Sequence, residues 1–252
     1  MEFIVIILGL LMGSFYNVVG TRLPERKSIV KPGSHCPKCT HTLSWYENIP
    51  VISYIFLKGQ CRKCKKTISI MYPLIELSTA ILFLISYQLF GLTEGFYISI
   101  ILASVVVLVF LTDSLYMIIL DEVLIVSAIL LFIVKVIYGD IMAGLISVGH
   151  GLIIFMAVYL LMLIGNYLFK KESMGGGDIK LSFIAGMVLG PYLGLFYIVF
   201  ASFLAFPYAI FVVIKNDDGI LPFGPFLATS ILFCFYNTDM IMEFLRRVVG
   251  IS

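Results

Sequence analysis

Long apolar segments separated by short polar or turn segments form the main pattern of the chain. A membrane-spanning helix needs roughly 20 mostly apolar residues. We expect about eight spans, over residues 3–20, 72–90, 96–112, 122–138, 141–169, 179–199, 201–214 and 222–236. The break between the sixth and seventh spans is expected around Gly190-Pro191-Tyr192, because only small and turn residues divide the apolar stretch from Leu181 to Ile214. The pattern predicts an all-α, polytopic membrane helical bundle, followed by an amphipathic surface helix over Met240–Gly250.

Composition agrees with this pattern. Hydrophobic residues make up 61% of the chain and charged residues 13%, far from the usage of soluble proteins. The first apolar segment has no basic residue before it and no small-residue cleavage site after it, so we expect it to stay attached. The net charge is +2, with the basic residues concentrated in one loop, which argues against a nucleic-acid partner.

The distribution of lysine and arginine predicts the orientation, because cytoplasmic loops are enriched in them. Ten of the 17 lie in residues 21–70, so we expect this loop to be cytoplasmic. Alternation then places residues 113–121, 170–178 and 215–219 on the same side. That side receives fourteen basic residues, including Lys171 and Lys215, and the other side three, Lys135, Arg246 and Arg247. The prediction is a multi-pass protein of the plasma (inner) membrane.

The predicted cytoplasmic loop contains two C-x2-C pairs separated by 21 residues. Two such pairs favour tetrahedral zinc ligation by Cys36, Cys39, Cys61 and Cys64 over free thiols or a redox pair. Four cysteines leave no open position, so we expect a structural metal in a small zinc-ribbon-like loop. His35 and His41 are interpreted as loop histidines, and Cys234 as a small apolar residue of the last span.

Two aspartates stand out at the predicted cytoplasmic ends of spans, where ionisable residues are functional candidates. Asp113 ends the third span, and Asp178 follows three glycines at the start of the sixth. Their side chains can meet at one membrane face and act as an aspartic protease pair. Taken singly, Asp178 also fits a helix N-cap, and Asp113 a partner of Lys180 or Lys170.

Other polar residues in or near the spans receive different interpretations. Asp121 and Glu122 are interpreted as structural, because acidic residues are favoured near a helix N-terminus. His150 and Asn166 are interpreted as helix-packing groups. Glu76, just inside the second span, remains a candidate without an assigned role.

An ordered series of motifs resembles the type IV prepilin peptidases, membrane aspartic proteases that remove leaders from type IV pilins and pseudopilins. The series covers nearly the whole chain and comprises Gly13–Val18, Arg22–Pro24, Ser34–Cys39, Leu43–Pro50, Gly59–Cys64, Tyr72–Glu76, Asp113, Gly175–Leu181 and Pro222–Pro225. The resemblance implies a helical membrane bundle whose catalytic pair, Asp113 and Asp178, lies near the cytoplasmic face.

The resemblance also implies substrates and a second activity. The substrates would be prepilins or pseudopilins, with a short basic leader that ends in glycine and precedes a hydrophobic helix. Many members also methylate the new N-terminus with S-adenosylmethionine, which assigns residues 1–95 to methyl transfer and residues 96–252 to proteolysis. Substrate-positioning roles would fall to Gly175, Gly177, Lys180, Pro222 and Gly224. Where the family commonly has an acidic residue and a proline after its first catalytic aspartate, this chain has Leu115 and Leu120, so Asp121 is left out of the catalytic set.

Two other functions remain open from the sequence. In a transporter or channel, Asp113 and Asp178 would line an ion path. In a non-catalytic assembly factor of a pilus or secretion machine, the cysteine loop would dock partners. The transporter alternative predicts transport that survives without proteolysis. The assembly alternative predicts that both aspartates can be replaced with asparagine without loss of substrate processing.

Overall fold

The computed structural model describes residues 1–170, 174–214 and 222–249. Its regular elements are helices, accompanied in the described ranges by two isolated β-bridges. The chain divides into two compact units, Met1–Gly91 and Leu92–Ser252. The expectations for Lys171, Lys215 and Gly250 fall outside the described residues. The predicted all-α class is confirmed.

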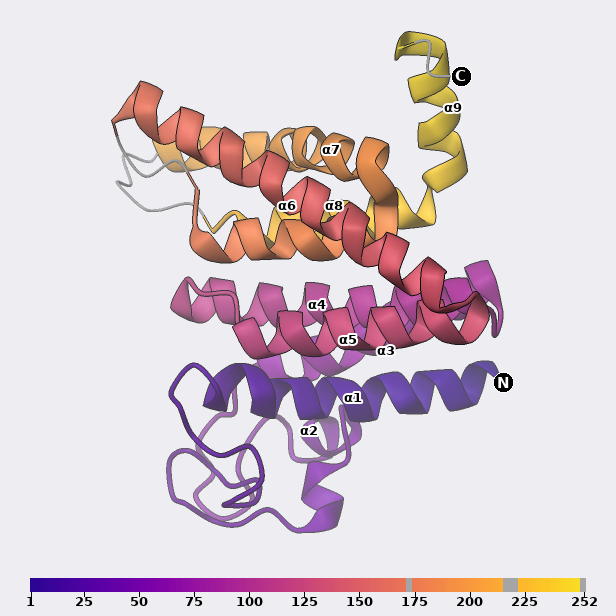
Figure 1. Ribbon diagram of the computed structural model, residues 1–252. Coiled ribbons are helices and arrows are strands. Elements are labelled where there is room, and N and C mark those ends of the chain that lie inside the picture. Colours follow the sequence, from indigo (N-terminus) through magenta and orange to yellow (C-terminus); the bar gives the residue numbers. More distant parts are fainter. Residues whose placement is uncertain (171–173, 215–221, 250–252) are drawn as a thin grey trace. The chain divides into compact units, whose positions relative to one another are not determined.

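The first unit is built on two long helices, α1 (Glu2–Arg22) and α3 (Met71–Phe90), which pack on each other (Figure 1). Gly9 and Gly13 form their contact surface. A Cβ added at Gly9 would lie 2.6 Å from Ala80 Cα, and one at Gly13 would lie 2.6 Å from Glu76 Cα. Small residues four apart therefore let the two backbones touch, as in helix pairs that associate in lipid.

The segment between α1 and α3 has little regular structure apart from a short 3-10 helix, η1 (Trp45–Asn48), and α2 (Ile52–Phe56). Two side chains attach the segment and the start of α3 to the helix pair. Asn17 Nδ2 donates to Tyr72 O at 3.0 Å, and Val51 N–H donates to Glu76 Oε2 at 2.7 Å. The Glu76 carboxylate, left without a role by the sequence, thus fixes Val51, whose backbone is in the left-handed region at φ 60°.

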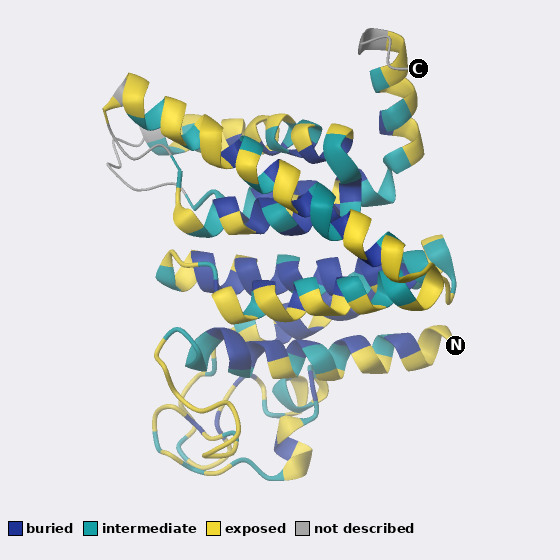
Figure 2. Ribbon diagram, in the orientation of Figure 1, coloured by how far each residue is buried: buried dark blue, intermediate teal, exposed yellow. Residues whose placement is uncertain are grey.

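The second unit contains six helices among its described residues: α4 (Glu94–Tyr116), α5 (Asp121–Tyr138), α6 (Ile141–Phe169), α7 (Gly176–Ile214), α8 (Gly224–Tyr236) and α9 (Thr238–Val249). α4 packs on α5 and α8, and α7 packs on α6 and α8. In Figure 2, α4 is largely buried and α6 largely exposed. α9 is strongly amphipathic, as predicted.

α7 is interrupted at Gly190, whose φ of 70° and ψ of −173° leave the helical region. Glycine tolerates this conformation, and Pro191 follows it at the first position of the next helical segment, where it has no N–H to lose. Figure 1 shows the two halves of α7 running in opposite directions. The chain therefore divides at Gly190, within the Gly190-Pro191-Tyr192 turn expected between the sixth and seventh spans, and not at residue 200, where the ranges 179–199 and 201–214 placed the boundary.

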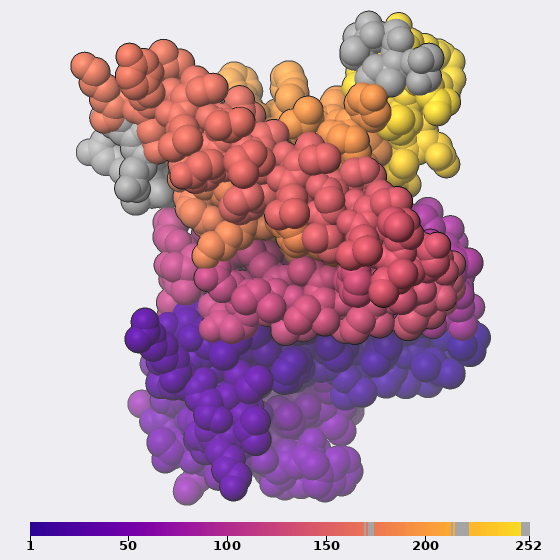
Figure 3. All heavy atoms as spheres, viewed as in Figure 1, coloured from indigo at the N-terminus to yellow at the C-terminus, as the bar shows by residue number. Residues whose placement is uncertain are grey.

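Within the described residues, five helices are long and apolar enough to cross a membrane: Glu2–Arg22, Met71–Phe90, Glu94–Tyr116, Ile141–Leu168 and Gly176–Val212. The exposed surface of α6 is apolar over most of its length, with Leu145, Ile153 and Leu160 each more than half exposed. Figure 3 shows α6 at the molecular surface on the face in view. This is the composition of a lipid-facing helix. The multi-pass membrane prediction is supported, while the expected number of about eight spans stays a prediction.

Candidate functional site

Asp113 and Asp178 line one cavity of about 550 Å³ within the second unit. Asp113 lies near the C-terminal end of α4 and is 7% exposed. Asp178 lies in the first turn of α7, and its carboxylate interacts electrostatically with that of Asp113. The 65 residues between them are therefore folded so that two acidic side chains share one water-accessible space.

Each aspartate lies at one end of a helix, and its carboxylate is held by a backbone group: Gly175 holds Asp178, and Gly224 of α8 holds Asp113. Asp178 is the third residue of α7, and its carboxylate reaches back to the backbone of Gly175, the residue before the helix. This is the reverse half of a capping box, rather than the N-cap role considered from the sequence. Asp113 is approached by the backbone of Gly224, while its Oδ2 is buried without a hydrogen-bond partner among the described residues.

Gly175 and Gly177, predicted to position substrate, also line the cavity, and their lack of side chains has a local structural reason. A Cβ at Gly175 would lie 3.3 Å from Asp178 Oδ2. A Cβ at Gly177 would lie 2.8 Å from Ile119 Cβ, which is too close for an unshifted backbone. The loop that carries Asp178 therefore packs directly on the connection that follows Asp113.

Gly224 begins α8 beside Asp113. Its added Cβ would lie 3.0 Å from Asp113 Oδ2 and 3.0 Å from Ile119 Cδ1. Pro225 follows at the first turn of α8, and Pro222 lies just before it, half-buried. The Pro222–Pro225 motif is thus adjacent to the aspartate site, although Pro222 is not among the residues that line the cavity.

Lys180 lines the cavity but pairs with a different aspartate from the one considered in the sequence. Its Nζ lies 2.7 Å from both carboxylate oxygens of Asp121, the first residue of α5. Neither Lys180 nor Lys170 has an ion pair with Asp113 in the part of the chain that the structure describes. Asp121 therefore has the structural position at a helix N-terminus that the sequence predicted.

The sequence did not identify Met117, Ile118 and Ile119 as part of the site, yet they line the same cavity. α4 ends at Tyr116, and the next residue, Met117, has a φ of 56° that turns the chain back toward Asp178. The available signal was the uncharged run from 115 to 120, which is too short to span a membrane and lies between two acidic positions. These residues supply an apolar wall beside the carboxylates.

In the first unit, the Sγ atoms of Cys36, Cys39, Cys61 and Cys64 all lie within 4.8 Å of one another. Two of the distances, Cys36 to Cys64 and Cys39 to Cys61, are 3.9 Å. A Zn–S bond of about 2.3 Å places the sulfurs of a tetrahedron roughly 3.8 Å apart, whereas a disulfide needs about 2.05 Å. The cluster therefore fits a four-cysteine metal site.

The two C-x2-C pairs have the same backbone structure. Cys36 N–H donates to His41 O, and Cys61 N–H donates to Lys66 O, both at 2.9 Å. The residues after the second cysteines, Thr40 and Lys65, both have positive φ. Backbone N–H groups of Cys64 and Lys63 lower the pKa of the Cys61 thiol to about 6, whereas burial and the neighbouring thiols raise the pKa of the Cys39 thiol to about 11.

The histidines of this loop have other partners, in agreement with the prediction. His35 Nδ1 lies 2.9 Å from Gly33 O. His41 Nε2 lies 3.4 Å from Glu47 Oε2, and Glu47 is buried. The N–H of Ser44 and the neighbouring His41 hold the pKa of Glu47 below its usual value. Cys234 is a buried residue of α8 in the second unit.

Comparison with known proteins divides the chain as the two compact units, Met1–Gly91 and Leu92–Ser252, do. The model of the Bacterial Peptidase A24 N-terminal domain matches residues 7–90, and that of the Type IV leader peptidase family matches residues 100–210. A prepilin leader peptidase/N-methyltransferase of Bacillus subtilis (strain 168) is 34% identical over 253 residues, which cover 98% of this chain and 99% of the relative. No solved structure matches the chain.

Two further relatives carry the same name. The one from Vibrio cholerae serotype O1 is 32% identical over 261 residues, with 94% of this chain and 98% of the relative covered. The one from Myxococcus xanthus is 48% identical over 101 residues, with 40% of this chain and 30% of the relative covered. With similarity along its full length to such enzymes, the chain belongs to the type IV leader peptidase family.

Proposed function

We propose that this protein removes the leader peptide from type IV prepilins or pseudopilins by aspartyl proteolysis, with Asp113 and Asp178 as the catalytic pair. The observation that carries the proposal is that these two carboxylates share one cavity and interact electrostatically. Family membership supplies the reaction and the substrate class. An assembly role does not need two carboxylates in one cavity, and an ion path does not need them to interact with each other.

The chemistry follows from two adjacent carboxyl groups that hold one proton between them. The ionised carboxylate accepts a proton from a water molecule, whose oxygen attacks the scissile carbonyl carbon. The protonated carboxyl donates a hydrogen bond to the carbonyl oxygen and stabilises the developing charge. As the C–N bond breaks, a proton passes to the leaving amine, and the leader ends in a new carboxylate.

The cavity lining suits the expected substrate on its leader side. Glu122 adds an acidic side chain beside the catalytic pair, while Asp121 is paired with Lys180, and a basic leader is attracted to such an acidic surface. We propose that this cavity faces the cytoplasm at the plasma (inner) membrane, because the basic residues of the chain are concentrated in the segment 21–70. The hydrophobic helix of the substrate would then remain among lipid and the apolar helices.

We propose that the cysteine cluster binds zinc and is structural. Four thiolates complete a tetrahedral shell, so the metal has no position for a substrate or water. The segment between α1 and α3 has two short helices and few buried apolar side chains, so a metal supplies cohesion that a core would otherwise give. Cys36, Cys39, Cys61 and Cys64 would hold it.

We further propose that the protein methylates the new N-terminal amine with S-adenosylmethionine. Support for this activity comes from the shared name of the relatives and from the match of residues 7–90 to the N-terminal domain model. The cofactor would supply the methyl group. No residue of this chain is placed in that reaction.

The test is leader removal from a co-expressed prepilin, followed by gel shift and intact mass. Wild type is compared with Asp113→Asn and Asp178→Asn, and with Asp239→Asn, an exposed aspartate of α9, as the matched control. We expect cleavage by wild type and the control and none by the two site variants, each verified as folded by its gel-filtration profile. Cleavage by a folded site variant would make that aspartate structural. An added methyl mass on the product reports the second activity.

A further inference from the structure

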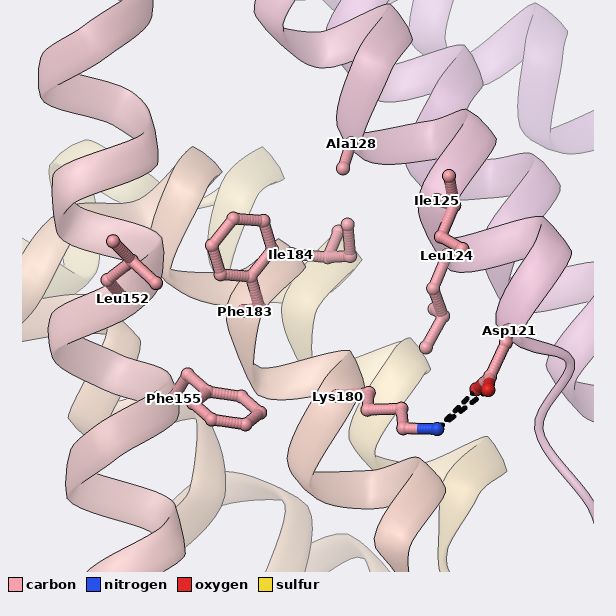
Figure 4. A pocket seen from close by; sticks show the side chains of 9 residues that line it. All are labelled: Asp121, Leu124, Ile125, Ala128, Leu152, Phe155, Lys180, Phe183 and Ile184. Carbon is pink, nitrogen blue, oxygen red and sulfur yellow. Dashed lines mark hydrogen bonds and ion pairs between the residues drawn. The ribbon is translucent and has the colours of Figure 1, made fainter.

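A second hollow lies next to the aspartate cavity, between α5, α6 and α7 (Figure 4). It has a volume of about 320 Å³. In Figure 4, Leu124, Ile125 and Ala128 come from α5, Leu152 and Phe155 from α6, and Phe183 and Ile184 from α7. Its polar side chains are Lys180 and Asp121, which pair at one end. We call this hollow the apolar groove.

The apolar groove adjoins the aspartate cavity, because Asp121 and Lys180 line both. Asp178 and Lys180 are two residues apart in the first turns of α7. A chain that passes the two catalytic carboxylates therefore reaches the groove within a few residues. Since Lys180 and Asp121 neutralise each other there, the boundary between the two spaces carries no net charge.

The groove is open toward the surroundings of the molecule. Leu152 and Ile125 on its walls are 56% and 59% exposed. Gly151 on α6 helps to shape it, since a Cβ at that position would lie 2.8 Å from Phe183 Cε2. Because Gly151 has no side chain, the Phe183 ring can lie against α6 and form one wall. The groove is thus built into the packing of α6 on α7.

We propose that the apolar groove is the subsite for the first apolar side chains after the scissile bond of the substrate. This inference rests on the proposed function and adds where the substrate binds on the far side of the cut. The two adjoining spaces match the substrate in kind: the carboxylate pair suits the scissile bond, and the apolar groove suits the start of the hydrophobic segment.

The size of the groove limits what it holds. A cavity of about 150 Å³ holds one benzene molecule. The groove, at about 320 Å³, therefore accepts one large aromatic or two aliphatic side chains, and not a whole helix. A lipid acyl chain is the other occupant that an open apolar hollow in a membrane attracts. Adjacency to the catalytic cavity, through the shared Asp121 and Lys180, favours the substrate, because its apolar segment begins at the scissile bond.

Filling the groove provides the test. Ala128→Leu replaces a methyl group on the α5 wall of the groove with an isobutyl group. Ala157→Leu on α6, outside the groove, is the matched control. Two prepilins are compared, with phenylalanine or alanine directly after the cleaved bond. We expect Ala128→Leu to lower kcat/KM about 10- to 100-fold for the phenylalanine substrate and less than about threefold for the alanine substrate. The alanine substrate also shows that the variant is folded.

A second measurement separates docking from cleavage. A prepilin with a photoreactive phenylalanine derivative directly after the scissile bond is irradiated with the Asp178→Asn enzyme, which we expect to bind but not cut. We expect cross-links to Leu152, Phe155 or Phe183. If wild type cuts no prepilin, the proposed function fails. If wild type cuts and Ala128→Leu affects both substrates equally or neither, or the cross-links lie elsewhere, the groove is a lipid site and the inference is overturned.

Discussion

Gly224, the first residue of α8, lies against Asp113 at the end of α4. A Cβ at Gly224 would approach Asp113 Oδ2 to 3.0 Å, and Val109 and Ile119 close the space on its other sides. We therefore expect Gly224→Ala to displace the Asp113 carboxylate. A displacement of about 1 Å costs roughly a hundredfold in rate, so leader cleavage should fall about 10- to 100-fold in kcat.

The control for this prediction is Gly149→Ala on α6, where an added Cβ meets no atom within 4 Å. Its cleavage rate should stay close to that of wild type. Measurement of kcat and KM separately identifies the cause, because loss of alignment lowers kcat and loss of binding raises KM. A Gly224→Ala enzyme with wild-type kcat would show that this close approach is unimportant for catalysis.

Metal content tests the cysteine cluster. We expect purified protein to contain about one zinc per chain by plasma mass spectrometry, and Cys61→Ser to lose most of it, because three thiolates leave the shell incomplete. Protease cleavage within residues 23–70 should then increase. Cys234→Ser, which alters the buried cysteine of α8, should keep its zinc. Wild type purified without metal, yet with this segment protected, would contradict a structural zinc.

Glu76 is expected to stabilise the attachment of the cysteine-containing segment to α3. Its Oε2 accepts the Val51 N–H at 2.7 Å. Loss of a hydrogen bond to a charged group costs about 1.5–3 kcal/mol, so Glu76→Ala should lower the thermal midpoint of unfolding and expose the segment to protease. Glu76→Gln keeps an acceptor oxygen and should restore much of the loss. Equal behaviour of the two variants would assign Glu76 another role.

The stability of the same segment is expected to depend on pH through the ionisation of Glu47. The Ser44 N–H, and then His41, hold its folded-state pKa below the ordinary value, so ionised Glu47 stabilises the fold. This contribution is present above about pH 4.5 and is lost as pH falls through the folded-state pKa. Trp45 is the sole tryptophan of the chain, so its fluorescence reports on the neighbouring segment.

We expect the fluorescence of wild type to change below about pH 4.5. Glu47→Gln should show the altered emission already at neutral pH, because the amide attracts the Ser44 N–H and His41 less strongly than a carboxylate. Glu25→Gln, near the start of the same segment, is the control and should follow wild type. An identical titration of wild type and Glu47→Gln would exclude Glu47 as the group responsible.

Much of the site was predictable because its residues are locally conspicuous. An acidic residue at the end of an apolar run, or a glycine triplet before an aspartate, stands out in a chain with 13% charged residues. The paired C-x2-C spacing likewise predicted four clustered sulfurs. Each signal depends on a few adjacent residues and on the cost of burying charge.

Helix partners and exact pairings could not be predicted in this way. A helix with apolar residues on every side does not reveal which side meets protein and which meets lipid, so the contact of Gly9 and Gly13 with α3 had no clear signal. Lys180 has a long side chain, and Asp113 and Asp121 both lie near it in the sequence-based topology. Lys180 pairs with Asp121 because the connection after α4 brings the first residue of α5 next to the start of α7.

The reversal at Gly190 shortens the distance over which α7 extends. As one straight helix, its 39 residues would extend about 58 Å, nearly twice the roughly 30 Å of a bilayer core. The turn instead returns the chain to the end where Asp178 begins α7 (Figure 1), from which Gly224 can reach Asp113. The conformation of one glycine thus makes neighbours of two glycine-rich motifs that are far apart in the sequence.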